Sequence, residues 1–222
     1  KNTDANYSGF LVHNYQTDND LGFTTQAGLT SEQFSQNTVR VTSTGLIASE
    51  TNVDQAANSG VDQFRLEQED FGFFAQEEVN FQDKVIGTIG LRGDKSSNNG
   101  DANEFFYYPK GTLAVNLNQF AIFGDALNTN NVKLRVAYGE AGNVAPNRAL
   151  FTTYLNSTID GNVGIVTPST LGDQNIQPER QKELEYGFDV GLFYDRVNLQ
   201  VTAYNKKVED LILQADNEPS SG

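Results

Sequence analysis

Hydrophobic and polar residues alternate along much of the chain, most regularly between residues 183 and 205. The first half of this segment, ELEYGFDVGL, is hydrophobic at every second position, and the alternation resumes in VNLQVTA after a short polar turn at 194–196. A period of two places the two sets of residues on opposite faces of a β-strand. Each run is about nine to eleven residues long, the length of a tilted strand that crosses a hydrocarbon core. The segment therefore predicts an amphipathic hairpin, which suits either a soluble β-sandwich or a transmembrane β-barrel.

Comparable runs recur along the whole sequence and predict an all-β, antiparallel fold of about nine strands. The expected strands are residues 7–15, 21–29, 38–47, 64–81, 85–92, 105–117, 132–138, 184–193 and 197–213. Residues 178–183 combine Pro with Glu, which suits the first turn of a helix, so we expect at most one helical turn there. One strand breaks the pattern: Glu77 shares a face with Phe73 and Phe81. The position of Glu77 implies either a β-bulge in this strand or a place outside the hydrocarbon zone.

The connections between these runs alternate between tight and long. Residues 82–84 and 194–196 are tight turns. The segment 120–131 is intermediate in length, but it stands where the alternation requires a short turn. The segments 93–104 and 139–182 are long. Outer-membrane barrels have short periplasmic turns and long extracellular loops, whereas a sandwich has no reason to sort its loops by length. The alternation favours a barrel segment.

Aromatic residues gather at both ends of the expected strands. Those beside the tight turns are Phe81, Phe120, Phe123, Phe193 and Tyr194, and those at the opposite ends are Phe71, Phe73, Phe74 and residues 105–108. Two aromatic girdles at the membrane interfaces explain this arrangement. The alternative is that these rings fill the core of a sandwich. Lys, Arg, Asp and Glu on the second face of the strands suit a hydrated lumen.

Composition narrows the function. The chain carries 29 Asp and Glu against 15 Lys and Arg, a net charge of -14, which argues against a nucleic-acid partner. It has no Cys, so neither a disulfide framework nor a thiolate metal site is possible. The single His, His13, is expected to be a surface residue rather than a ligand or a catalytic base. We therefore expect no enzyme activity, and we assign no catalytic, cofactor-binding, metal or substrate-binding residue.

Three groups of residues are candidate sites. The loop 93–101 is rich in oxygen ligands, but it lacks the EF-hand spacing, and exposed turns such as 18–20 use the same residue types. Glu183, Glu185 and Asp189 share one strand face at a spacing that approaches a glycosidase carboxyl pair, although a charged lumen wall explains them as well. The glycines of 87–90 and 139–143 form neither a dinucleotide fingerprint nor a P-loop.

Longer stretches of the sequence resemble a known family. The segments KLRVAYGEAGN at 133–143 and IQPERQKELEYGFDVGLFYDRVNLQVTAYNKKVEDLIL at 176–213 are similar to the barrel of SusC/RagA-type TonB-dependent outer-membrane transporters. The stretch FGFFAQEEVNFQDKVIGTIGLRGDKSSNNG at 71–100, followed by residues 106–115, resembles the preceding strands of that barrel. The resemblance covers about half of the chain well, and residues 1–62 fit it loosely.

The resemblance implies a 22-stranded barrel to which this chain contributes under half of the strands. It also implies an N-terminal plug, a TonB box, the TonB complex and a SusD-like surface lipoprotein as partner. Residues 1–222 are then part of one barrel domain, with the plug and the C-terminal strands outside them. We expect a protein of the Gram-negative outer membrane, in contact with its lipid, that imports oligosaccharides, peptides or chelates into the periplasm. A secreted or surface β-sandwich that binds ligands and a passive porin-like channel are the alternatives.

Overall fold

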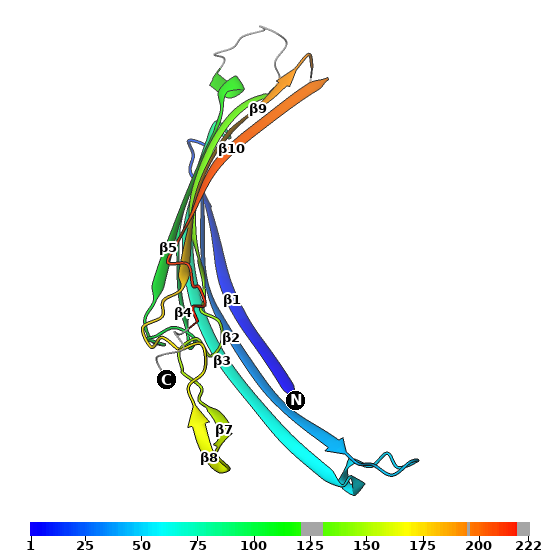
Figure 1. The fold of residues 1–222 in the computed structure, drawn as a ribbon. Helices are drawn as coiled ribbons and strands as arrows, with labels where there is room; N and C mark the ends of the chain where they lie inside the picture. The colour runs from blue at the N-terminus through cyan, green and yellow to red at the C-terminus, as the bar shows by residue number, and fades with distance from the viewer. Residues whose placement is uncertain (121–130, 195, 217–222) are drawn as a thin grey trace.

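The computed structural model describes residues 1–120, 131–194 and 196–216, and their main element is one eight-stranded antiparallel sheet (Figure 1). Its strands follow the order β1 (Asn2–Gln16), β2 (Leu21–Thr44), β3 (Asn58–Phe81), β4 (Val85–Ser96), β5 (Phe106–Asn116), β6 (Asn131–Asn143), β9 (Glu179–Leu192) and β10 (Val197–Glu209). A separate hairpin joins β7 (Leu155–Ile159) to β8 (Asn162–Val166), and two short 3-10 helices are η1 (Val53–Gln55) and η2 (Leu117–Phe120). The sheet curves strongly without closing, so the chain forms part of a barrel wall.

Most of the strands are longer than the sequence pattern predicts. The expected strands 21–29 and 38–47 are one continuous strand, β2, which pairs with β3 from Leu21↔Phe81 to Thr44↔Asn58. The helical turn expected at 178–183 is wrong, because β9 begins at Glu179 and pairs with β6 there. Strand β10 ends at Glu209 rather than at residue 213, and the β7–β8 hairpin was not predicted. Backbone pairing continues where side-chain alternation stops, because strands beyond a membrane have water on both faces.

Cross-strand register divides the sheet into two faces. Residues paired across neighbouring strands share a face, and one such row runs Val115, Leu134, Phe188, Val201. We call this side the apolar face. Where hydrophobic residues alternate along the strands, it consists of the odd-numbered residues of β1–β5 and β10 and the even-numbered residues of β6 and β9. The other side is the polar face. The hairpin of β9 and β10 therefore has the faces that its alternation predicts.

The hydrophobic residues of this protein lie mainly on its surface. Among the described residues, only Tyr108, Val132 and Ala145 are buried hydrophobic side chains, whereas Leu134, Phe188, Val201 and many others are exposed. A β-sandwich would bury such residues between two sheets. No second sheet covers the apolar face in the described part of the chain, so the sandwich alternative is wrong.

The alternation of connection lengths is confirmed. Turns 17–20 and 82–84 and the turn residues 193, 194 and 196 lie at one end of the sheet, and the connections 45–57, 97–105 and 144–178 lie at the other (Figure 1). Most of the intermediate segment 120–131 lies outside the described residues. We call the two ends the turn end and the loop end. Beyond the end of β4 at Ser96, β2 and β3 continue as an arm that makes up residues 33–69 with its tip. Strand β1 still pairs with β2 as far as Asn2↔Gln36, and the arm is two-stranded beyond that row.

Aromatic rings mark both ends of the apolar face. At the loop end Phe105 lies 6.1 Å from Phe71 and 5.4 Å from Phe73, and Phe73 lies 6.2 Å from Tyr107, measured between ring centroids. At the turn end, Phe81, Phe193 and Tyr194 are exposed. Three rings expected in the girdle, those of Phe74, Phe106 and Tyr108, lie on the polar face instead, because their even positions alternate with the girdle residues. Phe123 lies outside the described residues.

No helix among the described residues is long and apolar enough to cross a membrane.

Candidate functional site

The carboxylates of β9 are held by an arginine of β6. Arg135 lies on the polar face, where its guanidinium is 3.3 Å from the Asp189 carboxylate and 3.7 Å from that of Glu185. It also donates a 2.7 Å hydrogen bond to the Thr202 hydroxyl of β10. Gly187 leaves room for this arrangement, because a Cβ there would lie 3.3 Å from two guanidinium nitrogens. Glu185 and Asp189 are therefore ion-paired residues of the polar face, as the lumen interpretation predicts, whereas Glu183 on the same face forms no ion pair with a described residue.

The other candidate residues from the sequence have structural roles. His13 is exposed on the apolar face of β1, and 18–20 form the turn to β2. The loop 93–101 is buried against the connection 144–178: the Asn98 amide donates to the Ala145 carbonyl, and the Gly100 N–H donates to the Ile176 carbonyl. Two of its side-chain oxygens accept backbone hydrogen bonds: Ser97 Oγ accepts from the Glu69 N–H at 2.9 Å, and Asp101 Oδ1 accepts from the Asn103 N–H at 2.8 Å. Within the described residues, no group of three His, Asp or Glu side chains could hold a metal ion.

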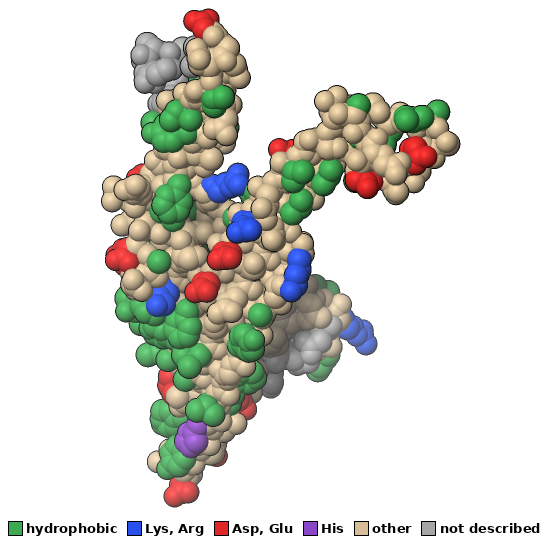
Figure 2. Space-filling view, turned by 90° about the horizontal axis from the view of Figure 1, so that it is seen from below, with side chains coloured by type: hydrophobic (Ala, Val, Ile, Leu, Met, Phe, Trp, Pro, Cys, Tyr) green, Lys and Arg blue, Asp and Glu red, His purple; other side chains and the backbone are tan. Residues whose placement is uncertain are grey.

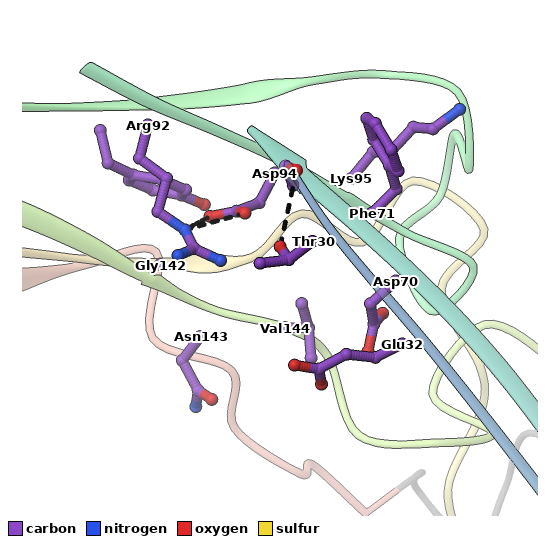
Figure 3. Close-up of a pocket in the computed structure, with 12 residues that line it drawn as sticks. Thr30, Glu32, Asp70, Phe71, Arg92, Asp94, Lys95, Gly142, Asn143 and Val144 are labelled. Atoms are coloured by element: carbon purple, nitrogen blue, oxygen red, sulfur yellow. Dashed lines mark hydrogen bonds and ion pairs between the residues drawn. The ribbon is translucent and has the colours of Figure 1, made fainter. Parts of the chain in front are cut away.

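A recess of the polar face lies near the loop end (Figure 3). It has a volume of about 240 Å³ and is built by β2, β3, β4, β5 and β6, with Thr30, Glu32, Asp70, Arg92, Asp94, Tyr108 and Asn143 among its lining residues. Strands far apart in the sequence therefore supply its side chains. We call it the loop-end recess.

A glycine and an ion pair shape the centre of the loop-end recess. The Arg92 Nε donates to both carboxylate oxygens of Asp94, at 2.7 and 2.9 Å. Gly72 pairs with Asp94 on the next strand, and a Cβ at this position would overlap the Asp94 carboxylate and lie 2.9 Å from the Thr30 hydroxyl. The Thr30 hydroxyl donates instead to the Gly72 carbonyl at 3.5 Å (Figure 3). The missing side chain at Gly72 lets three polar groups converge.

Tyr108 and Gly142 form the wall on the side of β6. Tyr108 is 6% exposed, and a Cβ at Gly142 would overlap its hydroxyl. The Arg180 guanidinium lies 5.4 Å from the Tyr108 ring centroid and forms a 2.6 Å ion pair with Glu140. A cation over an aromatic face is attracted by the ring quadrupole. Backbone pairing between β5 and β6 ends at Lys110↔Gly139. Beyond this point, these side-chain contacts hold β6 and β9 against β5.

Two carboxylates of the loop-end recess have no cation of their own. Glu32 and Asp70 are direct cross-strand partners, and neither forms an ion pair with a described residue. Glu32 accepts from the Asn6 amide at 3.2 Å, and Asp70 accepts from the Gln68 amide at 2.7 Å through one oxygen. The other carboxylate oxygen of Asp70 is buried and accepts no hydrogen bond in the described part. Like charges directly opposite on two strands destabilise a sheet, so a ligand that donates hydrogen bonds would stabilise this pair.

Charged and hydrophobic side chains are also separated on the face that Figure 2 shows. Seen from the loop end in Figure 2, acidic and basic side chains lie close together over the middle of the molecule, and hydrophobic side chains form clusters along its margin. The sequence pattern does not predict the loop-end recess. Gly72 and Gly142 are the residues that could have indicated it, because each leaves space for a larger side chain. Those side chains come from other strands, so the sequence around each glycine does not identify them.

These features define a class of protein. A curved antiparallel sheet with exposed hydrophobic side chains, aromatic girdles, tight turns at one end and long loops at the other is a section of an outer-membrane-type β-barrel. The whole chain, residues 1–222, matches the family described as TonB dependent receptor-like, beta-barrel, and it belongs to that family. This is a family of the Gram-negative outer membrane.

Individual relatives support the assignment. The chain is 30% identical over 143 residues to TonB-dependent receptor P3 of Formosa agariphila, and 28% identical over 156 residues to TonB-dependent receptor P26 of the same organism. These matches cover 63% and 68% of this chain but only 14% and 16% of the relatives. The chain thus spans a small part of the length of the curated relatives that it matches.

Solved structures share the fold. The RagAB peptide transporter superposes with a TM-score of 0.83 at 16% identity, over 95% of this chain and 24% of the other. The siderophore receptor PirA from Acinetobacter baumannii gives a TM-score of 0.55 at 17% identity, over 94% of this chain and 27% of the other. The agreement in fold, together with the family match, bears out the resemblance to SusC/RagA-type transporters.

Proposed function

We propose that this chain forms part of the wall of an energised outer-membrane transporter for peptides or oligosaccharides. The observation that carries the proposal is the pair Glu32 and Asp70 in the loop-end recess, two adjacent carboxylates that form no ion pair with a described residue. Such a pair favours cargo that presents ammonium or hydroxyl donors and disfavours anionic cargo such as many metal chelates.

The distribution of charge along the polar face supports a capture site at the loop end. Further toward the turn end, Glu185 and Asp189 are paired with Arg135, and Glu78 has an uncharged threonine, Thr24 or Thr88, opposite it on each neighbouring strand. Two carboxylates directly opposite each other are thus a feature of the loop-end recess, where cargo would bind before it passes along the rest of the wall. The long connections 97–105 and 144–178 would take part in recognition, since loops on a rigid scaffold commonly carry binding residues.

The proposal includes partners outside these residues. The family name supports coupling to the TonB complex, and the fold shared with the RagAB transporter supports a SusD-like surface lipoprotein as partner. A plug domain and a TonB box would lie in a part of the protein outside residues 1–222. The inner-membrane proton gradient, acting through TonB, would rearrange the plug and release cargo to the periplasm.

The test compares uptake by the full-length transporter with and without the carboxylate pair. In a host that lacks other importers, uptake of labelled oligopeptides and oligosaccharides is measured for the wild type and for E32Q/D70N. We expect the double variant to lose at least about tenfold in affinity for its cargo, which corresponds to about 1.4 kcal/mol.

Glu67→Gln is the matched control, because Glu67 is an exposed carboxylate on the same strand but on the opposite face. Unchanged cargo affinity in E32Q/D70N would overturn the assignment of the recess. Uptake that persists in a host without TonB would show a passive porin-like channel instead of an energised transporter.

A further inference from the structure

A groove runs along the apolar face across β1, β2 and β3. It has a volume of about 840 Å³. Its lining is mainly hydrophobic and includes Tyr7, Leu11, Ala27, Leu29, Phe73 and Ala75. Leu11 and Leu29 are exposed, so nothing in the described chain covers the groove. Because this face is turned toward lipid, the groove opens into the hydrocarbon of the membrane. We call it the apolar groove.

The apolar groove is confined to the loop-end half of the hydrophobic band, where a row of three polar residues bounds it. In this row His13 pairs with Thr25, and Thr25 pairs with Glu77. The pairing of β3 with β4 continues without a break on both sides of Glu77, so no bulge turns its side chain toward the polar face. Glu77 is also four residues from each of Phe73 and Phe81, the aromatic residues at the two ends of the apolar face. Both explanations expected from the sequence, a bulge and a place outside the hydrocarbon zone, are therefore wrong.

Toward the loop end, the apolar groove adjoins a polar pocket of about 410 Å³, with which it shares Ser31 and Phe71. The cation of this pocket is Lys95, which pairs with Phe71 and therefore lies on the apolar face. Figure 3 shows Lys95 and Phe71 together, across the strands from Glu32 and Asp70. The groove and the pocket form one site that begins at the aromatic girdle and continues into the hydrophobic band. We call it the girdle site.

The Lys95 ammonium group has free hydrogen-bond donors beside it. It lies 5.4 Å from the Phe105 ring centroid and forms no ion pair with a described residue. The side chains of Ser31, Gln33 and Asn103 line the same pocket, and none of them forms a hydrogen bond within the described part of the chain. A phosphate group carries negative charge and accepts several hydrogen bonds, so it suits an ammonium group among hydroxyl and amide donors. The pocket therefore has the chemistry of a phosphate site.

In the strands that the structure describes, the lysines of the apolar face all lie at the loop end. They are Lys95 of β4, Lys182 of β9 and Lys207 of β10. Lys182 and Lys207 both form ion pairs with Glu209, which leaves Lys95 as the lysine among these three without an anion. In a Gram-negative outer membrane, phosphorylated glycolipids make up the leaflet on the extracellular side, where the loops of a barrel lie. The cations of this face thus match the leaflet that has anionic headgroups.

We propose that the girdle site binds a phosphorylated glycolipid of the outer leaflet, with a phosphate at Lys95 and an acyl chain in the apolar groove. From the row of Phe71 to the row of Ala75 is four residues, about 13 Å at ~3.3 Å per residue, so the site extends from the headgroup level into the hydrocarbon. Glu69 lies one row beyond Phe71, farther from the membrane, where it meets the divalent cations that accompany such headgroups. The lipid is held on the outer wall, so this inference does not depend on the cargo.

The first test measures lipid binding. The full-length transporter is extracted into a mild detergent, delipidated, and mixed with lipid A or with dephosphorylated lipid A, and the complexes are counted by native mass spectrometry. We expect the wild type to bind lipid A about tenfold more tightly than the dephosphorylated lipid, and Lys95→Gln to lose this preference, because a hydrogen bond to a charged group is lost. Lys207→Gln, which removes a lysine of the same face outside the girdle site, is the matched control and should bind like the wild type. Equal binding of the two lipids by the wild type, or an unchanged preference in Lys95→Gln, would overturn the proposal.

A second test locates the acyl chain. A photoreactive amino acid replaces Leu29 in the apolar groove, and the full-length protein is irradiated after extraction from the outer membrane and washing in mild detergent. We expect a covalent adduct with the glycolipid. The same amino acid at Leu184, which is exposed on the apolar face of β9 outside the groove, should give none, because unbound lipid has been washed away. An adduct of position 29 with a protein, or equal lipid adducts at both positions, would contradict the proposal, whatever cargo the transporter imports.

Discussion

Arg135 is expected to stabilise the wall by joining three strands. It contacts Glu185 and Asp189 of β9 and Thr202 of β10 from its place on β6. These two ion pairs involve side chains that are 23–37% exposed, so each is worth about 0.5–1 kcal/mol after screening by solvent. The hydrogen bond to Thr202 adds about 1 kcal/mol, and the buried Nε of Arg135, which has no partner in the described part, offsets about the same amount. Replacing Arg135 by Met should therefore cost about 1–2 kcal/mol.

The assay is reversible unfolding of the full-length transporter in lipid vesicles, followed by tryptophan or tyrosine fluorescence in urea. Met keeps most of the aliphatic volume, so the loss reports on the charge rather than on packing. A double-mutant cycle with Asp189→Asn isolates the pair, with an expected coupling of about 0.5–1 kcal/mol. If Arg135→Met were as stable as the wild type, or if the coupling with Asp189→Asn were zero, the pairing would not hold the wall together.

Val201→Lys, in the middle of the apolar face, should destabilise the barrel by about 2–4 kcal/mol, whereas Gln200→Lys on the polar face should cost less than half as much. The shift of heat-modifiable migration on gels measures both, and equal effects would contradict the assignment of faces. Gly142→Val should displace the Tyr108 ring and lower the melting temperature, which calorimetry measures. Adding Tyr108→Ala should restore part of the lost stability, and a failed rescue would contradict the contact. Replacing the β7–β8 hairpin by a Gly-Ser linker should leave membrane insertion and heat-modifiable migration unchanged, because the hairpin pairs only with itself, and loss of insertion would refute this.

The sequence predicts this fold best where lipid and water act on opposite faces of a strand. The hairpin of β9 and β10 is such a place, because Leu184 to Leu192 and Val197 to Ala203 must alternate to meet both environments. Prediction fails along the arm, where residues 33–37 and 58–63 have water on both sides and no reason to alternate. There β2 continues because its backbone pairs with β3, which a hydrophobic pattern does not record.

The candidate site was harder to predict than the wall. The parity of Glu185 and Asp189 places them on the polar face, but Arg135 lies 50 residues or more away in the sequence. The loop-end recess joins Glu32, Asp70, Arg92, Tyr108 and Asn143 from five strands, and only the register of those strands brings them together. Glu77 is the opposite case: its exceptional position was visible in the sequence, and the structure shows that it is a real exception rather than an irregularity of the strand.

The arm of β2 and β3 has the geometry of a lever. Strand β1 supports it as far as the row of Gln36 and Leu66, and just beyond this row the connection 144–178 touches it, where the Arg148 guanidinium lies 4.1 Å from the Phe64 ring centroid. From Leu66 to this contact is two residues, about 7 Å, and from Leu66 to the end of the ribbon at Asn58 is eight residues, about 26 Å, at ~3.3 Å per residue. In a ribbon that pivots as one piece at Leu66, a displacement at Phe64 is about four times as large at the tip. A small rearrangement of the connection thus becomes a larger movement at the end of the arm.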